Sequence, residues 1–286
     1  MRVALTGANG FTGRYVTAAL DAAGVAWTSL EADLRDPAAV ERTVAETAFD
    51  SLVHLAGHAF VGAPEWPSFY AVNQLGTLHL LNAVARARPG ARCILASSAQ
   101  VYGPGAEGLI GEDAPANPNN HYSISKFAME LGAALSRGQL DIVVTRPFNY
   151  TGVGQGIDYL IPKIVDHFRR RADVIELGNT WVERDFGDVR SVAEAYVGLV
   201  LAETVPSVAN ICTGTVHSIG AIMEMLGGIS GHSLEIRVNP AFVRANDVAV
   251  LGGDSARLRA ALPGWRPRAL LETLEWMYWS PAEQRP

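Results

Sequence analysis

The sequence predicts an α/β fold in which helices cover both faces of a parallel sheet, and two observations lead to this prediction. First, a glycine-rich turn near the N-terminus joins a short apolar run to a helical pattern. Second, further apolar runs alternate with helical patterns through the first half of the chain, which is typical of a doubly wound, Rossmann-type sheet. The predicted strands comprise residues 3–5, 25–30, 52–55, 93–96 and 142–145.

The N-terminal turn has the features of a dinucleotide-binding site. Its first glycine permits the turn, its second lets the backbone approach a pyrophosphate, and its third allows close contact between helix and strand. The helix that follows presents unpaired N–H groups to phosphate. The spacing G-x-x-G-x-x-G differs from G-x-G-x-x-G, but its place between a strand and a helix favours a nucleotide site. The candidate cofactor-binding residues in this turn are Gly7, Asn9, Gly10, Phe11, Thr12 and Gly13.

A second group of residues has the types and spacing needed for proton transfer. Tyr122 and Lys126 are four residues apart, so on a helix they share one face and the ammonium can approach the phenol. A nearby cation is expected to lower the phenol pKa and make Tyr122 a general acid or base near neutral pH. Ser98, on the loop that leaves a predicted strand, can hydrogen-bond the same reacting oxygen. In isolation the pattern also fits an ordinary surface helix, but the glycine turn favours catalysis.

The rest of the chain predicts a second, smaller lobe. Residues 1–150 are expected to form the cofactor-binding domain, in which Asp36 and Pro37 start a helix that runs through residue 44. Residues 103–118 are predicted to form a loop over the active site. Residues 151–286 are expected to form mainly a substrate-binding lobe, with some segments returning to the first domain. This lobe is predicted to hold a strand at 174–177 and helices at 158–171, 192–201, 219–226 and 257–261.

Composition excludes several classes of function. The net charge is −6 and no Lys/Arg-rich run extends beyond residues 169–171, so nucleic-acid binding has little support. No stretch approaches the length of a membrane span and the chain opens with a strand, so we expect a cytoplasmic protein without a membrane partner. Cys93 and Cys212 lie in apolar runs and are predicted to be reduced core residues. Because His54 and His58 flank a strand end and a glycine turn, no metal site is expected.

Seven motifs, in order along the chain, resemble the extended branch of the short-chain dehydrogenase/reductase family, the enzymes that modify nucleotide sugars. Within that branch the chain is most similar to the GDP-4-keto-6-deoxy-D-mannose reductases that make GDP-D-rhamnose. The segments that carry this similarity are residues 146–155, 210–214 and 244–248. The seven motifs lie at residues 6–13, 54–57, 73–77, 97–103, 122–126, 146–152 and 184–186.

The resemblance implies roles for further residues. Leu34, Leu55, Ala56, Gly57 and Pro147 are expected to contact the cofactor, together with Tyr122 and Lys126, which also binds the nicotinamide ribose. The expected ligands of the nucleotide sugar are Asn149, Arg184, Arg244 and Asp247. The two arginines suit a diphosphate because each guanidinium offers a planar fork of donors. By contrast, Asp185 and Asp188 are predicted to form surface salt bridges.

The chain departs from the family pattern before Asp33, where a helix and a strand are missing. Asp33 lies twenty residues after Gly13, the distance expected for an acid that binds the ribose hydroxyls of NAD. It fits equally well as the family aspartate that borders the adenine, with the ribose-binding segment deleted. The first interpretation favours NADH. The second lets Arg35 bind the 2′-phosphate of NADPH, so both NADH and NADPH remain possible cofactors.

The residues after Ser98 narrow the reaction. Family 4,6-dehydratases carry an Asp-Glu pair at this point, whereas this chain has Ala99 and Gln100, so dehydration is not expected. What remains is hydride transfer at C4 of the sugar, with Tyr122 protonating the carbonyl oxygen. The resemblance favours a reductase of a 4-keto-6-deoxy sugar, and a 4-epimerase with tightly bound NAD is the alternative. A nucleotide-binding regulator without chemistry is a third hypothesis, which the intact Ser98, Tyr122 and Lys126 disfavour.

Two predicted helices, at residues 69–86 and 123–135, are apolar on more than one face. A helix that contacts only a sheet needs a single apolar face, so a partner surface is implied. Relatives that the chain resembles pair through these two helices, and we therefore expect a two-fold homodimer with a four-helix interface. The residues that carry this prediction are Leu75, Leu78, Leu81, Ile124, Phe127, Met129 and Leu131.

Overall fold

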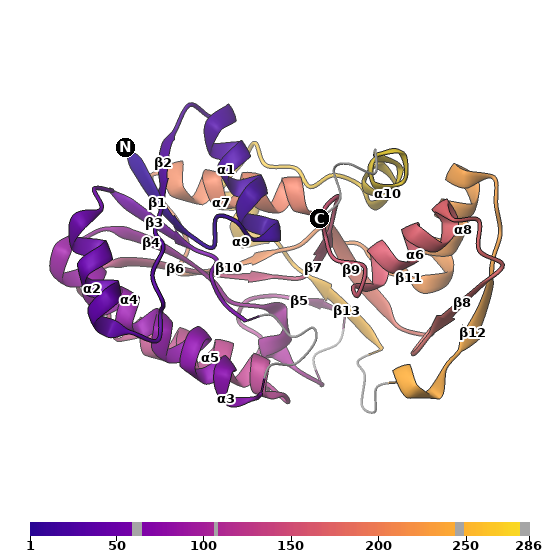
Figure 1. Cartoon of the computed structure of the whole chain (residues 1–286), viewed down its shortest axis with the longest axis horizontal. Coiled ribbons are helices and arrows are strands. Elements are labelled where there is room, and N and C mark those ends of the chain that lie inside the picture. Colours follow the sequence, from indigo (N-terminus) through magenta and orange to yellow (C-terminus); the bar gives the residue numbers. More distant parts are fainter. Residues whose placement is uncertain (59–64, 106–107, 244–248, 281–286) are drawn as a thin grey trace.

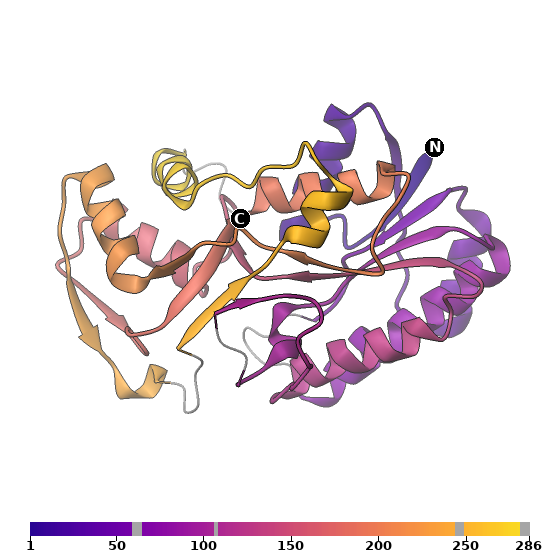
Figure 2. The same ribbon diagram turned by 180° about the vertical axis from the view of Figure 1, so that it is seen from behind.

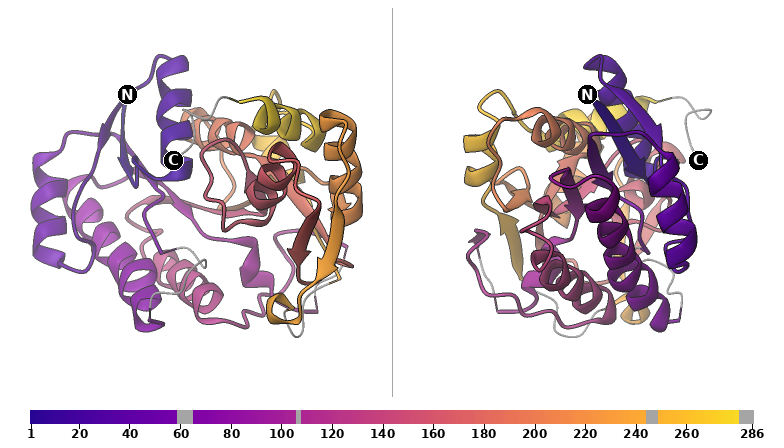
Figure 3. Two further views of the ribbon diagram at one scale, coloured as in Figure 1. Left: turned by 45° about the vertical axis from the view of Figure 1, so that its right-hand side comes forward. Right: turned by 90° about the vertical axis from the view of Figure 1, so that its left-hand side faces the viewer.

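The structure, a computed structural model, describes residues 1–58, 65–105, 108–243 and 249–280. A parallel sheet with helices on both faces forms one side of the molecule, and a second group of strands and helices forms the other (Figure 1). Figure 3 shows the same two groups side by side from two further directions. The predicted α/β fold of the Rossmann type is confirmed.

The main sheet has six parallel strands in the order β10-β6-β4-β3-β1-β2. The five predicted strands are all present, each within two residues of its predicted ends. The sixth strand, β10, returns from the C-terminal half of the chain to pair with β6. The strands are β1 (Arg2–Thr6), β2 (Ala26–Ser29), β3 (Ser51–His54), β4 (Arg92–Ala96), β6 (Asp141–Pro147) and β10 (Val208–Ile211).

The connection after β2 is short, as predicted. β2 is the edge strand beside β1, and residues 30–36 pass directly to α2 (Pro37–Glu46) without a helix or a strand. The Asp36 side chain accepts hydrogen bonds from the backbone N–H groups of Ala38 and Ala39, and Pro37 occupies the first helical position. Both features start a helix because they satisfy or remove N–H groups that have no partner within it. The predicted helix start is confirmed.

Helices from distant parts of the chain cover the two faces of the sheet. α1 (Phe11–Ala22) packs with α7 (Val189–Leu201) on one face, while α2, α4 (Thr77–Ala87) and α5 (His121–Ala134) cover the other (Figures 1 and 2). α3 (Pro67–Phe69) and a π-helical stretch, η1 (Tyr70–Gly76), lead into α4. α7 and α9 (Ala256–Ala261) were expected in the smaller lobe, and that expectation is wrong: they pack against α1 and β10. Their apolar residues belong to the core beneath the sheet.

The second group has its own apolar core. α6 (Leu160–Arg169), α8 (Ile219–Ser230) and α10 (Leu270–Trp279) pack together around it. Of the predicted elements, the strand at 174–177 is β8, and the helices at 158–171 and 219–226 are α6 and α8. The 103–118 segment holds a short strand, β5, which pairs with β13. The remaining elements are β5 (Leu109–Ile110), β7 (Asn149–Thr151), β8 (Val174–Leu177), β9 (Glu183–Asp188), β11 (Val216–Ser218), β12 (Glu235–Val238), β13 (Val250–Gly253), η2 (Ala99–Tyr102) and η3 (Pro240–Phe242).

Two smaller observations complete the fold. Cys93 and Cys212 are buried and unpaired, as predicted. Within the described ranges, no helix has the length and apolar character needed to cross a membrane.

Candidate active site

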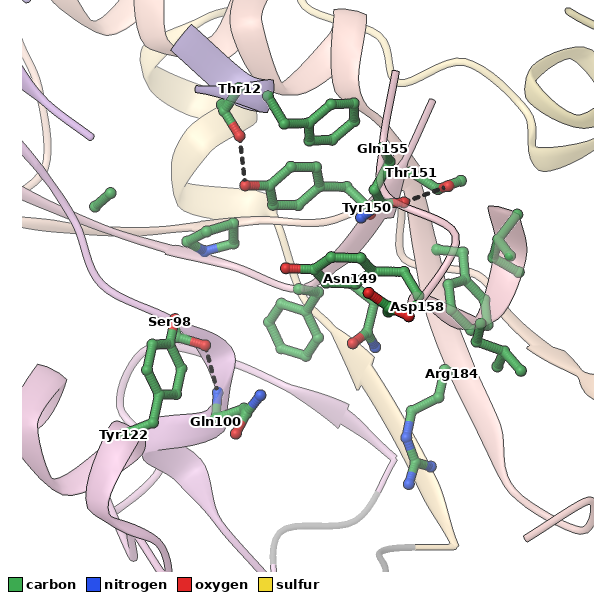
Figure 4. Close-up of a pocket in the computed structure, with 18 of the residues that line it drawn as sticks. Thr12, Ser98, Gln100, Tyr122, Asn149, Tyr150, Thr151, Gln155, Asp158 and Arg184 are labelled. Carbon is green, nitrogen blue, oxygen red and sulfur yellow. Dashed lines mark hydrogen bonds between the residues drawn. The ribbon is translucent and has the colours of Figure 1, made fainter. Parts of the chain in front are cut away.

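A pocket of about 650 Å³ opens between the carboxyl ends of the central strands and the C-terminal lobe. Ligands of doubly wound sheets bind at this edge. Figure 4 shows Ser98, Gln100 and Tyr122 on one side of the pocket and Asn149, Tyr150 and Arg184 on the other. A second cavity of about 490 Å³ adjoins the glycine turn and the end of β2. Every predicted site residue that the structure describes lines one of these two cavities.

The glycine turn is too tight to hold side chains. Gly7 has φ +73°, and a Cβ there would lie 2.8 Å from the backbone nitrogen of Ala56. A Cβ on Gly13 would lie 2.0 Å from the carbonyl oxygen of Gly7. At Gly10 the nearest atom would be 3.3 Å away, and the backbone there faces both cavities. The turn therefore fits a pyrophosphate at the N-terminus of α1, as a dinucleotide cofactor requires.

The second cavity fits the adenosine half of such a cofactor, and it contains an acid that the sequence did not single out. The Glu31 carboxylate lies at the end of β2, where it accepts hydrogen bonds from Ser29 Oγ (3.1 Å) and Asn9 Nδ2 (3.3 Å). Asp33 also lines this cavity, but Arg35 binds its carboxylate at 2.7 Å and holds its pKa down at about 2. The sequence placed a single acid here because Glu31 lies only eighteen residues after Gly13, short of the usual spacing.

The position of Tyr122 follows from the cap of its helix. The Asn120 side chain accepts a hydrogen bond from the Ser123 N–H, and the Ser123 hydroxyl bonds back to the Asn120 N–H. This capping box fixes the first turn of α5, so Tyr122 faces Ser98 at the end of β4 (Figure 4). Burial raises the pKa of Tyr122 to about 12, although its hydrogen bond with Ser98 acts in the opposite direction.

The expected effect of Lys126 on Tyr122 is therefore corrected. The two residues share one face of α5, but the Lys126 ammonium donates to the carbonyl oxygen of Ala96 at 2.8 Å. Burial lowers the pKa of Lys126 to about 8, and the Glu130 carboxylate opposes that shift. The spacing predicted the common face correctly. It did not predict that removal of the phenol from water would raise the phenol pKa.

Asn73 is a further buried residue beside the site. It lies in η1, its amide oxygen accepts the His58 N–H at 2.8 Å, and its amide nitrogen donates to Ser125 Oγ at 3.2 Å. A Cβ on Gly57 would lie 2.9 Å from the Asn73 oxygen and 3.2 Å from Lys126 Nζ, which leaves no room for a side chain there. The sequence placed Asn73 in a family motif without giving it a role. Its π-helical backbone is a feature often found at functional sites.

A buried ion pair lies beside the candidate catalytic residues. Arg146 binds both oxygens of the Glu130 carboxylate, at 3.1 and 2.6 Å, and the two side chains are only 8% and 7% exposed. Ser97 also donates to Glu130, and the Arg146 guanidinium lies 4.9 Å from the centre of the Tyr102 ring. This network joins α5 and β6, which carry Lys126 and Pro147, to the segment between β4 and η2, which carries Ser98.

The lobe side of the pocket carries two of the four predicted sugar-nucleotide ligands. Asn149 begins β7. Arg184 lies on β9, where one of its guanidinium nitrogens donates a hydrogen bond to the Glu183 carbonyl oxygen at 2.8 Å. Between them and the glycine turn, the Tyr150 hydroxyl bonds Thr12 Oγ1 at 2.8 Å. Arg244 and Asp247, the other two predicted ligands, lie outside the described residues.

The prediction of surface salt bridges at Asp185 and Asp188 is wrong, because both side chains are fully buried. Asp185 accepts hydrogen bonds from the backbone N–H groups of Thr213 and Gly214, and burial raises its pKa. Asp188 caps α7 and pairs with Arg190 at 2.6 Å. The two acids hold the junction between the sheet and the lobe.

His54 has a structural role. Its ring lies between the hydroxyls of Thr6 (2.6 Å) and Thr77 (2.8 Å), and burial lowers its pKa to about 3, so it is uncharged. Across the described part of the chain, no group of three or more His, Cys, Asp or Glu side chains is arranged to hold a metal ion.

Comparisons with known proteins agree with this geometry. The family model of GDP-mannose 4,6 dehydratase matches residues 22–277. GDP-6-deoxy-D-talose 4-dehydrogenase of Aggregatibacter actinomycetemcomitans is 35% identical over 287 residues, covering 97% of each chain. GDP-6-deoxy-D-mannose reductase of Pseudomonas aeruginosa is 32% identical over 289 residues, covering 95% of this chain and 93% of the relative. The structure of RMD from Pseudomonas aeruginosa complexed with NADPH has a TM-score of 0.85 and 31% identity, covering 97% of this chain and 96% of that one.

The fold, the glycine turn and these matches define the class. The protein is an NAD(P)-dependent enzyme of nucleotide sugars, of the extended short-chain dehydrogenase/reductase type. Within that class, the chain belongs to the GDP-mannose 4,6 dehydratase family.

Proposed function

We propose that this enzyme reduces the C4 ketone of a GDP-4-keto-6-deoxy sugar with NADH or NADPH. The observation that carries the proposal is the pairing of Ser98 and Tyr122 in a pocket that the glycine turn also lines. The names of the two relatives support the choice of substrate, because 6-deoxy-D-talose and 6-deoxy-D-mannose differ only in configuration at C4. One 4-keto sugar can therefore give either product by reduction.

The side chains suit this reaction. Tyr122 keeps its proton at neutral pH and can donate it to the carbonyl oxygen, while Ser98 hydrogen-bonds the same oxygen. The Lys126 ammonium, which donates a hydrogen bond to the Ala96 carbonyl oxygen, stabilises the negative charge that then forms on the phenol oxygen of Tyr122. A nicotinamide cofactor, when bound, would supply the hydride for C4. The first turn of α1 and residues Leu55, Gly57 and Pro147 would hold it.

The residues next to Ser98 support reduction without dehydration. Ala99 is buried and has only a methyl group, and Gln100 presents a neutral amide to the pocket. Neither side chain can remove a proton from the carbon beside the ketone. The pocket therefore has no base at the two positions where family dehydratases carry their acidic pair.

The adenosine cavity bears on cofactor exchange and preference. Because β2 is the edge of the sheet, no further strand encloses the cavity in the described part of the chain, and this favours release after each turnover. A 4-epimerase, the alternative, retains its cofactor. The Glu31 carboxylate favours ribose hydroxyls over a 2′-phosphate, so we infer a preference for NADH.

The test is a cofactor-oxidation assay with GDP- and UDP-linked sugars. We expect protein that purifies largely free of nicotinamide, oxidises one cofactor for each GDP-4-keto-6-deoxy sugar reduced, and has a higher kcat/KM with NADH than with NADPH. Interconversion of two UDP-hexoses without cofactor consumption, by protein that releases bound NAD on denaturation, would establish the epimerase instead.

A further inference from the structure

Gln100 lies beside the position where the reacting oxygen must bind. It follows Ser98 by two residues in η2, and its backbone N–H donates to Ser98 Oγ at 3.2 Å. Its side chain is half-buried and lines the pocket, next to Ser98 and Tyr122 (Figure 4). A sugar whose carbonyl oxygen contacts Ser98 and Tyr122 therefore presents one neighbouring carbon to Gln100.

One end of the Gln100 amide is already fixed. Its Oε1 accepts a hydrogen bond from Asn120 Nδ2 at 3.4 Å, and Asn120 is the residue that caps the helix of Tyr122. The amide nitrogen is left with two hydrogens, and none of the described residues accepts either of them. Gln100 thus offers an oriented hydrogen-bond donor to a ligand in the pocket.

The two flanks of the substrate carbonyl differ in polarity. In a 4-keto-6-deoxy hexose, C3 carries a hydroxyl group, whereas C5 carries a methyl group. A hydroxyl can accept the free N–H of Gln100, but a methyl group would leave that donor without a partner. A bound sugar covers this half-buried donor, and a donor that is covered without a partner carries a penalty equivalent to about 10- to 100-fold in affinity. The ring orientation with C3 beside Gln100 is therefore preferred.

The rest of the pocket is complementary to this orientation. Its lobe side includes apolar side chains that can receive the methyl group on C5; these are Leu160, Ile161, Leu177, Val182 and Phe186. Turning the ring over exchanges the two flanks and presents the opposite face of the carbonyl to the hydride donor. The two orientations therefore give opposite configurations at C4.

We propose that Gln100 sets the configuration of the product at C4 by donating a hydrogen bond from Nε2 to the C3 hydroxyl of the keto sugar. This inference rests on the proposed reduction of a 4-keto-6-deoxy sugar. It makes Gln100 a specificity-determining residue that selects which face of the ketone is reduced.

The experiment compares the wild type with Gln100→Met and Gln100→Leu, which keep the bulk of the side chain and remove its donors. The two C4 epimers of the product are quantified by NMR, and KM for the keto sugar is measured alongside. We expect the wild type to form one epimer, and both variants to form a mixture with KM raised about 10- to 100-fold. Gln139→Leu, at an exposed position away from the pocket, is the control for the type of substitution.

The outcomes separate this inference from the function on which it rests. A wild type that does not reduce any GDP-4-keto-6-deoxy sugar overturns the proposed function and this inference with it. A wild type that forms one epimer, with either active Gln100 variant forming the same epimer alone, overturns only the inference. A wild type that already forms a mixture overturns it as well. A merely structural role for Gln100 would reduce turnover without changing the ratio of epimers.

Discussion

Tyr122 is prepared to act as an acid because it is buried. A phenol with a pKa of about 12 is protonated throughout the neutral range, which is the state that a ketone reduction consumes. The sequence placed Tyr122 and Lys126 on one face of a helix correctly, because helical spacing determines which side chains share a face. Ser98, which caps η2, lines the same pocket. It did not give the direction of the Tyr122 pKa shift, since that depends on how deeply the phenol is buried.

Replacing the phenol tests its role directly. We expect Tyr122→Phe to lose about 100-fold or more in kcat, in line with general-acid contributions, while the affinity for NADH is retained. Steady-state kinetics and a cofactor titration measure the two quantities. Tyr278→Phe, which removes a hydroxyl in α10 outside the pocket, should keep wild-type kcat. A Tyr122→Phe enzyme with near-normal turnover would exclude Tyr122 as the acid.

The pKa of Lys126 predicts the basic limb of the pH profile. Burial lowers this pKa to about 8, so the side chain is charged below that pH and neutral above it. Because the charge stabilises the developing phenolate, kcat/KM should fall about tenfold for each pH unit above roughly 8. Tyr122 itself would lose its proton only near pH 12. A profile that stays flat to pH 10 would show that the Lys126 charge is not needed.

At the scale of elements, the sequence predicted those with local signals and missed those defined by distant contacts. The glycine turn, the Asp36 cap and the five strands depend on residues close together in the chain. The place of α7 against α1 depends on contacts between residues more than a hundred positions apart. The buried Asp185 and Asp188 bond Thr213 and Thr273, which lie 28 and 85 positions further along the chain. The prediction that these two acids lie at the surface rested on their charge, because acidic side chains are seldom buried without partners.

The ion pair between α5 and β6 gives a prediction for stability. Removing one partner of a buried pair leaves the other charge uncompensated, so Glu130→Ala should lower the free energy of unfolding by about 3–5 kcal/mol. Denaturant unfolding with matched m-values is the measurement. Glu235→Ala, which breaks the exposed pair with Arg237, should leave stability within experimental error of the wild type. Equal effects of the two substitutions would contradict the role given to the buried pair.

At the scale of the whole molecule, the exposed apolar surface on η1 and α5 bears on assembly. Leu75, Ile124 and Leu131 are exposed by 49%, 38% and 59%, whereas Leu81 and Met129 belong to the core. The sequence could not separate these two sets, because apolar residues on two faces of a helix look alike without the fold. The exposed leucines and isoleucine still form a surface suited to a two-fold partner.

We therefore predict a homodimer through these helices. Light scattering at micromolar concentration should give twice the chain mass for the wild type and the monomer mass for Leu131→Glu. Val238→Glu places the same charge at another exposed apolar position, on β12, and should remain dimeric. A monomeric wild type, or a Leu131→Glu variant that stays dimeric, would argue against this interface.

The central claim is that the pocket transfers a hydride from an exchangeable cofactor to C4 of a keto sugar, and isotopic labelling tests it most directly. The enzyme is incubated with a GDP-4-keto-6-deoxy sugar and NADH that carries deuterium at the transferable position. NMR of the product should place one deuterium at C4 for each cofactor oxidised. A sugar product without deuterium, formed without net oxidation of the added cofactor, would contradict the claim.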